Sequence, residues 1–332
     1  MIEKTDTHPY VIDKKKLKRF SKRKTIFGRK LYDKKADFYN IGMYDNSLEK
    51  IRQNKKGYSK YDYAKMMGSW TVYDYFHDAF NWNKLIDGNS VMDKPTLKKI
   101  QVKNQKSLTK EVKKTAIDFG AYTIGITKVN PLWIYSKNME NENINISQNC
   151  KYAIVMTVKM EGHMIKKSPS YNASVATGLA YSKIAFLISC MAEFIRSLGY
   201  DAIPMGNDTA LSIPLAIDAG LGQLGRNGLL ITPEYGPCVR ICKIFTNLPL
   251  QIDKPIDFGV TKFCKTCNKC SESCDADAIQ KVKEPSFRIE CPSNNKGIFR
   301  WAINHDKCYN FWIKNGGDCS NCIKVCPFFN RK

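Results

Sequence analysis

Cysteines in the C-terminal quarter of this 332-residue chain have a spacing that can bind metal clusters. Nine of the thirteen cysteines fall between Cys264 and Cys326. They form two motifs, Cys264-x2-Cys267-x2-Cys270-x3-Cys274 and Cys308-x10-Cys319-x2-Cys322-x3-Cys326. Such spacing is typical of proteins that hold two 4Fe–4S clusters, which pass single electrons. The sequence therefore predicts an electron-transfer protein or a redox enzyme.

The order of the two motifs predicts which cysteines share a cluster. In two-cluster ferredoxins, three closely spaced cysteines wrap one cluster, and the fourth, after a three-residue spacer, ligates the other. The first cluster is therefore expected to use Cys264, Cys267, Cys270 and Cys326. The second cluster is expected to use Cys274, Cys308, Cys319 and Cys322. The spacing leaves Cys291 open as an alternative to Cys308.

Zinc is the alternative metal, because four-cysteine sites with two-residue spacers also bind zinc. Two interleaved groups, with Pro327 after the last cysteine, favour iron–sulfur clusters. Asp275 stands where the first motif would usually have a proline, which affects a turn but removes no ligand. Disulfides are not expected, because the number of cysteines is odd and the sequence shows no export signal.

Residue composition divides the chain into three regions. Cysteine density rises near Phe258, so residues 258–332 are expected to form the cluster domain. Residues 107–257 alternate helix and strand patterns, which indicates an α/β or α+β domain. Residues 1–106 are basic and aromatic, without a clear repeat. One aromatic stretch there is expected to pack as the core side of a helix, with a cofactor or substrate wall as the alternative. It contains Trp70, Tyr73, Tyr75, Phe76, Phe80 and Trp82.

The middle region shows the clearest secondary-structure patterns. Helices are predicted over residues 108–119, 174–199 and 209–220. Strands are predicted over residues 121–129, 151–160 and 200–205. Asn207 or Asp208 is expected to cap the third helix. Four nearby glycines do not match a dinucleotide fingerprint, so turn geometry or close approach to a flat ligand is expected. They are Gly220, Gly222, Gly225 and Gly228.

The net charge of +22 bears on partners and location. Its densest patch lies within residues 14–19. A nucleic-acid partner is not expected, because a solvated basic face explains the charge; docking to an acidic electron donor or an anionic membrane is the alternative. No apolar run reaches the roughly 18 residues of a spanning helix. The start lacks a secretory signal, so a cytoplasmic protein is expected, or an exported, membrane-associated one if a leader is missing.

Several long segments resemble the reductive dehalogenase family. The resemblance is carried by LGYDAIPMGNDTALSIPLAIDAGLGQLGRNGLLITPEYGPCVRICKIFTNLPLQIDKPIDFGV, SPSYNASVATGLAYSKIAFLISCMAEFIRSLGY, RWAINHDKCYNFWIKNGGDCSNCIKVCPF and FSKRKTIFGRK. It covers nearly the whole chain and is most specific in residues 150–327. The related epoxyqueuosine reductases share the corrinoid fold and paired clusters, but their segments between these motifs match less well.

This resemblance implies an α+β architecture. A nitroreductase-like domain would hold a cobalamin-type corrinoid, and a ferredoxin-like domain with two 4Fe–4S clusters would follow it. Members of the family remove halide from organohalides by reduction. By position in the matching motifs, Tyr181 is the expected proton donor, with Asn207 of the GND turn and Arg240 after the GP turn around it. Thr177 lies one helical turn before Tyr181 and is the expected cofactor contact on the same face.

Elementary chemistry agrees with these implied roles. A phenol with a pKa of about 10 is a poor acid unless a cation stabilises its phenolate. Arg240 can supply that charge, and Asn207 can orient the donor or the halogen. No histidine stands in the Asp-x-His-x-x-Gly pattern of corrinoid proteins that use one as a cobalt ligand, so none is expected to bind cobalt.

Two departures from the family pattern affect the expected activity. Exported members carry a twin-arginine leader, and members continue further than Lys332 with a tail that helps close the corrinoid pocket. A fragment, a short variant or a protein of reduced activity is therefore expected. The competing functions are an epoxyqueuosine-reductase-like enzyme acting on tRNA and a ferredoxin-like electron carrier with an inactive upstream domain. The sequence does not identify the organohalide, the oligomeric state, or the donor, for which ferredoxin, flavodoxin or a membrane quinol system would serve.

Overall fold

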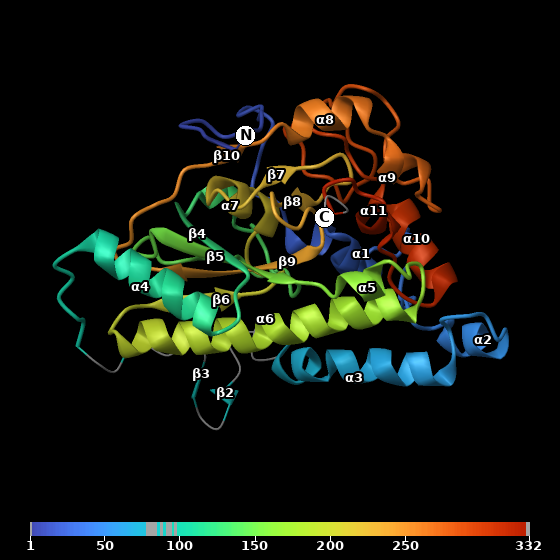
Figure 1. Cartoon of the computed structure of the whole chain (residues 1–332), viewed down its shortest axis with the longest axis horizontal. Coiled ribbons are helices and arrows are strands. Elements are labelled where there is room, and N and C mark those ends of the chain that lie inside the picture. Colours follow the sequence, from blue (N-terminus) through green and yellow to red (C-terminus); the bar gives the residue numbers. More distant parts are fainter. Residues whose placement is uncertain (1, 78–84, 87–88, 91–94, 96–97, 330–332) are drawn as a thin grey trace.

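A four-stranded antiparallel sheet forms the centre of the molecule, in the order β4-β5-β9-β6. The computed structural model describes residues 2–77, 85–86, 89–90, 95 and 98–329. The strands are β4 (Thr123–Lys128), β5 (Tyr152–Lys159), β6 (Ala202–Met205) and β9 (Val239–Thr246). Helices α4 (Gln105–Asp118) and α6 (Tyr171–Ser197) cover one face, and α7 (Ser212–Asp218) lies on the other (Figure 1). These layers confirm the predicted α+β fold.

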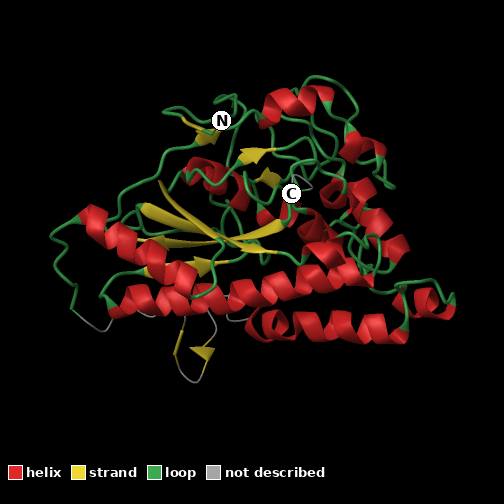
Figure 2. Ribbon diagram, viewed as in Figure 1, coloured by secondary structure: helices red, strands yellow, loops and turns green. Residues whose placement is uncertain are grey.

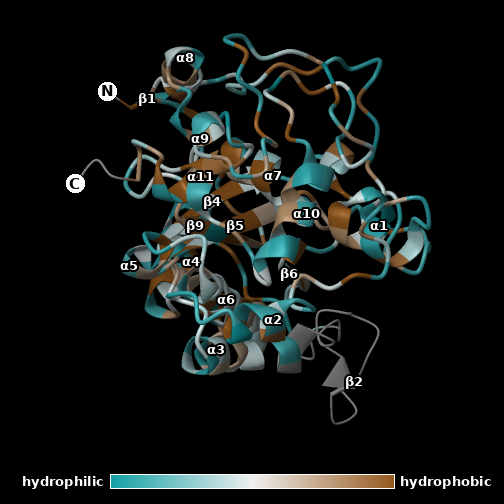
Figure 3. Cartoon of the chain, turned by 90° about the vertical axis from the view of Figure 1, so that its right-hand side faces the viewer, coloured by the Kyte–Doolittle hydropathy of each residue, from teal (hydrophilic) through white to brown (hydrophobic). Residues whose placement is uncertain are grey.

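Strand β5 shows why an apolar layer forms on each side of the sheet. Successive side chains of a strand point to opposite faces. Ile154 and Met156 pack in the core beneath α4 and α6, whereas Ala153 and Val155 pack in the core beneath α7. Figure 3 shows the hydrophobic colour concentrated along these central strands. Apolar side chains on both faces of the strand are therefore required here, and the predicted strand over residues 151–160 corresponds to β5.

Helix α6 begins three residues earlier than predicted and ends at Ser197, where Gly199 takes a positive φ of 85°. By length and composition alone it is apolar enough to cross a membrane, contrary to the expectation from the sequence. Most of that apolar stretch is buried inside the protein, against β5, β6 and β9. Core packing therefore accounts for its apolar character.

Helix α3 (Lys60–His77) runs alongside α6, as Figures 1 and 2 show. The two helices approach closely at Gly178, where a β-carbon would lie 2.3 Å from the Ser69 hydroxyl oxygen. Trp70 and Tyr73 of the aromatic stretch lie on this helix and are partly buried. Phe80 and Trp82 lie outside the described residues. The close approach brings the aromatic side chains of α3 next to α6.

The turn before α7 differs from the prediction. The helix begins at Ser212, its N-cap is Leu211, and no side chain caps it. Asn207 and Asp208 instead lie in a turn that ends at Thr209, whose φ of 61° reverses the chain before the helix can start. The prediction that either residue caps the helix was therefore wrong, and Asn207 is free for another role.

The glycine-rich segment after α7 packs against the protein's own chain. A β-carbon on Gly220 would lie 2.4 Å from the Lys254 carbonyl oxygen, and one on Gly222 would lie 2.2 Å from the Ile231 carbonyl oxygen. These contacts favour turn geometry over approach to a flat ligand. The turn joins a short hairpin of β7 (Gln223–Leu224) and β8 (Leu230–Ile231).

The remaining elements are short and join the three sequence regions. The C-terminal part contains β10 (Ile256–Asp257), α8 (Val260–Thr266), α9 (Lys269–Glu272), α10 (His305–Asn315) and α11 (Asn321–Lys324). Earlier elements are β1 (Glu3–Lys4), η1 (Lys22–Lys24), α1 (Ile26–Tyr32), α2 (Ser47–Arg52), β2 (Leu85–Ile86), β3 (Asn89–Ser90), η2 (Pro131–Trp133) and α5 (Gly162–Ile165). Strand β1 pairs with β10, and Arg29 of α1 pairs with Asp306 of α10 at 2.5 Å. The N-terminal region therefore packs against both later regions, and the boundaries at 106 and 257 stay predictions.

Candidate active site and cluster module

Tyr181, Asn207 and Arg240 come from three different elements and meet in space. Tyr181 lies on α6, Asn207 in the turn after β6, and Arg240 on β9. The Asn207 side-chain amide donates a hydrogen bond to the Tyr181 hydroxyl. The Arg240 guanidinium carbon lies 5.4 Å from the centroid of the Tyr181 ring. A phenol, an amide donor and a cation are thus within reach of one another.

Thr177 completes this arrangement one turn earlier on α6. Its hydroxyl accepts a hydrogen bond from Arg240 Nη2 at 3.3 Å and donates one to the Ala173 carbonyl at 3.1 Å. This hydrogen bond therefore fixes the position of the Arg240 guanidinium beside α6. The single proton of this hydroxyl is already used within the helix, so it is not available to donate to a cofactor. The predicted contact of Thr177 with a cofactor stays a prediction.

Two aromatic side chains of α3 enclose the ring of Tyr181. Trp70 stacks on it with centroids 5.2 Å apart, and Tyr73 meets it at 5.1 Å with the planes inclined by 60°. Burial raises the pKa of Tyr73 well above its ordinary value, and the neighbouring Tyr181 and Asp208 raise it further. Tyr73 therefore remains a neutral, apolar wall beside Tyr181.

Lys243 supports the turn that carries Asn207, and the sequence reasoning missed it. It lies on β9 opposite Met205 and is fully buried. Its ammonium donates to the Gly206 carbonyl, to the Asp208 carbonyl at 3.2 Å and to the Ser212 hydroxyl at 3.0 Å. Burial lowers the pKa of Lys243 to about 8. A lone lysine within the apolar strand pattern VRICKIFT was the available signal.

The first predicted group of cysteines comes together around the start of the C-terminal domain. Burial, together with the nearby Cys264 and Cys326, raises the pKa of the Cys270 thiol to about 12. Burial, with smaller contributions from Cys264 and Cys267, raises the pKa of Cys326 to about 11. Four cysteines from the two motifs are therefore neighbours, and an enclosed metal would be needed to hold them as thiolates.

The second predicted group is also assembled. Burial, together with the nearby Cys319 and Cys274, raises the pKa of Cys308 to about 12. Cys322 lies close enough to the same thiols for its pKa to be raised well above its ordinary value, chiefly by burial. Backbone N–H groups point at two of the sulfurs, Ala278 N at Cys274 and Asn321 N at Cys319, both at 3.4 Å.

Cys291 stands apart from both groups. Its thiol contacts the Ile303 carbonyl oxygen at 3.9 Å, and burial raises its pKa without a contribution from another cysteine. The geometry therefore places Cys308, not Cys291, beside Cys274 and Cys319. This arrangement supports the predicted ligand set, which stays a prediction.

The spacing of the cysteine thiols bears on the choice of metal. All thirteen cysteines are free thiols. Across the described part of the chain, no three histidine, cysteine or acidic side chains are close enough to hold a single metal ion. A mononuclear zinc site needs its sulfurs about 2.3 Å from one ion, whereas a cubane cluster spreads its four thiolates over a larger volume. Cubane clusters and zinc sites thus make different demands on the spacing of these thiols.

Buried polar atoms without partners gather where α6 meets the second cysteine loop. Within the described residues, the side-chain oxygens of Ser170 and Ser174 and one oxygen of Asp318 have no hydrogen-bond partner. The Nε atom of Arg240 is also buried and has no hydrogen-bond partner among the described residues. A β-carbon on Gly317 would lie 3.0 Å from the Ser174 hydroxyl oxygen, so the loop passes directly over this face of the helix. Unpaired buried polar groups are costly and indicate a partner outside the chain.

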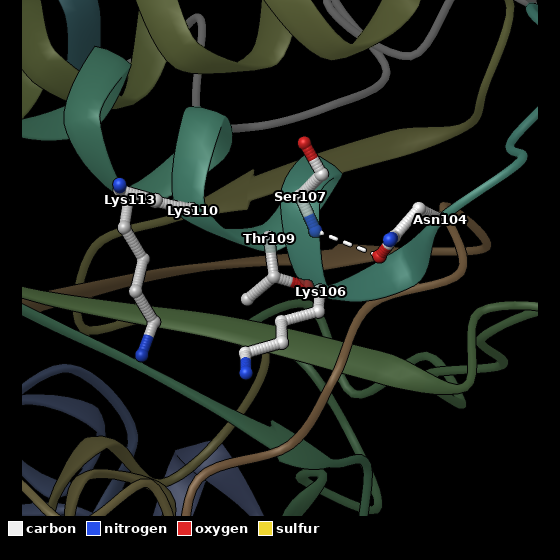
Figure 4. A pocket seen from close by; sticks show the side chains of 6 residues that line it. All are labelled: Asn104, Lys106, Ser107, Thr109, Lys110 and Lys113. Atoms are coloured by element: carbon white, nitrogen blue, oxygen red, sulfur yellow. Dashed lines mark hydrogen bonds between the residues drawn. The ribbon is translucent and has the colours of Figure 1, made fainter.

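A separate hollow of about 480 Å³ lies beside the start of α4 (Figure 4). It is lined by Asn104, Lys106, Ser107, Thr109, Lys110 and Lys113. Asn104 caps the helix by accepting from Ser107 N at 3.0 Å, and Lys113 pairs with Asp253 at 2.6 Å. These polar groups serve the fold, and the hollow contains none of the predicted site residues.

Comparison with known proteins gives matches for both later regions. Residues 132–250 match the family model described as reductive dehalogenase subunit, and residues 263–330 match the 4Fe-4S dicluster domain. The chain is 36% identical over 251 residues to the tetrachloroethene reductive dehalogenase of Sulfurospirillum multivorans, covering 67% of this chain and 50% of that protein. It is 34% identical over 291 residues to the tetrachloroethene reductive dehalogenase of Desulfitobacterium hafniense, covering 75% of this chain and 52% of that protein.

A solved structure has the same fold over nearly the whole chain. It is a reductive dehalogenase whose description refers to B12-dependent dehalogenation, with a TM-score of 0.78 and 22% identity. The match covers 99% of this chain and 44% of that one. The chain thus spans about half the length of the relatives it matches.

Proposed function

This chain belongs to the reductive dehalogenase family, and on that premise we propose that it removes halide from a small organohalide by reduction. The observation that carries the proposal is the contact of Tyr181 with Asn207 and Arg240, in one chain with a 4Fe-4S dicluster domain. A proton donor and an electron path are the two parts that such a reduction needs. The chemistry and the roles of the residues follow from that pairing.

Replacing a carbon–halogen bond by a carbon–hydrogen bond consumes two electrons and one proton and releases one halide ion. When bound, two 4Fe–4S clusters would supply electrons singly, and a corrinoid cobalt would supply the reductive cleavage of the carbon–halogen bond. The chain itself must supply the proton at the right place and exclude other proton sources. Its side chains around Tyr181 suit the first task, since the exposed Asn207 leaves the tyrosine hydroxyl open to an incoming substrate.

Tyr181 holds the proton at its hydroxyl. Asn207 donates to that oxygen, so the tyrosine's own O–H remains available to point toward a substrate. When the proton leaves, the hydrogen bond from the Asn207 amide and the charge of Arg240 stabilise the phenolate. Trp70 and Tyr73 keep bulk water from the ring faces. Positioned general acids of this kind contribute roughly 10²- to 10⁴-fold in rate.

The residues around α6 fit a corrinoid. Such a cofactor carries many amide side chains, which pair with hydroxyl and carboxylate groups. Ser170, Ser174, Thr177 and Tyr181 are spaced to share one face of the helix. The unpaired oxygens of Ser170, Ser174 and Asp318 would hold the cofactor's polar edge, and Tyr181 would lie further along the same face. Holding the cofactor by its edges leaves the metal open for chemistry.

The electron donor is part of the proposal. A net charge of +22 suits a small acidic carrier such as ferredoxin or flavodoxin, because opposite charges speed encounter. A membrane quinol system is the other donor consistent with a basic surface, since anionic lipids attract lysine and arginine. Reduction by purified ferredoxin, at a rate that falls as salt is raised, would indicate the soluble carrier, whereas binding to anionic vesicles with no reduction by ferredoxin would indicate the membrane donor.

The proposal is tested by anaerobic reconstitution with iron, sulfide and cobalamin. Reduced methyl viologen then serves as electron donor, and halide release is measured from chlorinated alkenes and halogenated phenols. We expect halide release with at least one class, and its loss in Tyr181→Phe. Protein that retains clusters and corrinoid but releases no halide from either class would contradict the proposal.

Two outcomes would favour the competing functions. Retention of clusters without any corrinoid indicates a ferredoxin-like electron carrier. A tRNA binding shift at low salt, with no halide release, indicates an epoxyqueuosine-reductase-like enzyme. Each outcome is read from purified protein in the same preparation.

A further inference from the structure

Arg226 is a buried guanidinium at the junction between the middle domain and the cysteine loops. It lies in the turn between β7 and β8, and only 2% of it is exposed. Its nitrogens donate five hydrogen bonds to carbonyl oxygens, at 2.6 to 3.1 Å. The accepting residues are Cys264, Cys267, Gln280 and Val282. Two of them are predicted ligands of the first cluster.

The neighbouring aromatic ring fixes the plane of this guanidinium. Trp301 lies under it, with the guanidinium carbon 4.7 Å from the ring centroid. The Trp301 indole N–H donates at 3.0 Å to the Val282 carbonyl, which also accepts from Arg226 at 2.6 Å. The side chain is therefore held in one orientation beside the first cysteine loop.

The charge of Arg226 has no acidic partner among the side chains that the structure describes. Arg29, another buried arginine, pairs with Asp33 at 2.8 Å and with Asp306 at 2.5 Å. Carbonyl oxygens satisfy the hydrogen bonds of Arg226 but carry no net charge to balance it. An uncompensated buried cation is strongly destabilising, so an anion is expected nearby.

We propose that Arg226 is the counter-charge of the cluster held by Cys264, Cys267, Cys270 and Cys326, and that it raises the reduction potential of that cluster. A cubane ligated by four thiolates carries net negative charge, and reduction adds one more. A fixed cation in a low-dielectric interior stabilises the reduced form more than the oxidised form. Arg226 acts on the cluster through its charge, and its hydrogen bonds to the loop fix that charge in place, so it is a tuning residue.

The neighbouring residue reaches the other cysteine group. Asn227 donates from its side-chain amide to the Cys322 carbonyl at 3.4 Å. The hairpin turn therefore contacts both cysteine loops. Because Asn227 is neutral, the turn places a charge only beside the first loop. The two clusters therefore differ in whether a buried cation lies beside them, and redox titration can resolve the effect. The titration does not depend on whether the protein dehalogenates any substrate.

The test is a redox titration of reconstituted protein followed by electron paramagnetic resonance. Arg226→Gln removes the charge and keeps a donor, and Arg226→Lys keeps the charge without the fork. Lys269→Gln is the matched control, since it removes an exposed, solvent-screened cation from the same loop. Cys326→Ser identifies which signal belongs to the first cluster. Iron content is measured on every variant.

We expect Arg226→Gln to shift the one-electron equilibrium of the first cluster toward the oxidised form by at least about tenfold, or about 59 mV. The second cluster should not move, and Arg226→Lys and Lys269→Gln should stay close to wild type. Unchanged potentials in Arg226→Gln at full iron content overturn the proposal. So does an equal shift in Arg226→Lys, because geometry would then be responsible. If Arg226→Gln fails to assemble the first cluster, Arg226→Lys decides: a wild-type potential supports the proposal and a tenfold shift overturns it.

Discussion

The cluster module and the proton site place their functional groups by different means. The cluster cysteines come from two short loops, one around α8 and α9 and the other around α11, with only Cys308 on a longer helix. The proton site takes one side chain each from α6, the turn after β6 and β9, and a buried lysine holds the turn. The close spacing of the cysteines in the sequence sets most of the geometry of the cluster module. Packing of the sheet against α6 sets that of the proton site.

This difference teaches which region is sensitive to which kind of change. A cluster holds its loops by strong metal–thiolate bonds, so removal of one ligand is the main way to destroy it. The proton site depends on weak hydrogen bonds and on packing over long sequence separations, so small shifts of its supports reduce its rate. Substitutions in each region should therefore produce separable losses.

Loss of a cluster ligand should have the largest effect. Cys326→Ser should remove the first cluster, halve the iron content from about eight atoms per chain, and abolish reductive activity. Cys291→Ser is the control, because the Cys291 thiol is held by backbone groups and no other cysteine contributes to its pKa. Iron and sulfide analysis measures both. Loss of a cluster in Cys291→Ser with retention in Cys308→Ser would reverse the assignment.

Loss of the tyrosine hydroxyl should have the next largest effect. Tyr181→Phe keeps the ring between Trp70 and Tyr73 and removes only the proton, so turnover should fall roughly 10²- to 10⁴-fold. Clusters and corrinoid should be retained, as measured by absorbance and metal content. Wild-type turnover under conditions where chemistry is limiting would show that another acid donates the proton.

The tyrosine and the arginine should act as one unit. Arg240→Lys keeps a charge but loses the planar fork that reaches Thr177, so it should also impair turnover. The double variant should lose little more than Tyr181→Phe alone, because both residues act on the same proton. Multiplicative losses in a double-mutant cycle would indicate that they act in separate steps.

Removal of the lysine beneath the turn should have a smaller effect. Lys243→Met leaves the Gly206 and Asp208 carbonyls without their donor and frees the turn that carries Asn207. We expect about a tenfold loss of turnover, the equivalent of one charged hydrogen bond. Asn207→Ala in the same background should add little. A full second loss from Asn207→Ala would mean that Lys243 does not act through the turn.

The smallest effect concerns pH and the cluster module. Burial, with a smaller contribution from the charge of Arg300, lowers the pKa of His305 to about 4. The unfolded chain takes up this proton near pH 6.5 and the folded chain does not, so stability is full above pH 6.5 and falls toward pH 4. At pH 5.5 the loss is about 1.4 kcal/mol.

Thermal midpoints at pH 7.5 and 5.5 measure this loss. His305→Asn should be less sensitive to the pH change than wild type. The exposed His163→Asn is the control and should behave as wild type. An equal pH dependence in wild type and His305→Asn would exclude His305 as the source.

Much of the molecule followed from the residues themselves. The strands over residues 121–129 and 151–160 and the helix over 174–199 were predictable, because a short β-branched apolar run indicates a buried strand and apolar residues at period 3.6 indicate a helix. The cluster domain was equally readable, because close cysteine spacing is itself the geometry of a cluster. The resemblance to a family pointed to Tyr181, Asn207 and Arg240 as candidates.

Tertiary structure alone decided how the remaining groups meet. The helical pattern predicted Asn207 or Asp208 as a cap, whereas the turn before α7 and the buried Lys243 leave Asn207 hydrogen-bonded to Tyr181, beside which the resemblance had placed it. The choice between Cys308 and Cys291 and the position of Arg226 also required the fold. These contacts join residues far apart in sequence, and no local periodicity records them. Sequence pattern states which side chains must be buried, whereas only packing decides which buried groups touch.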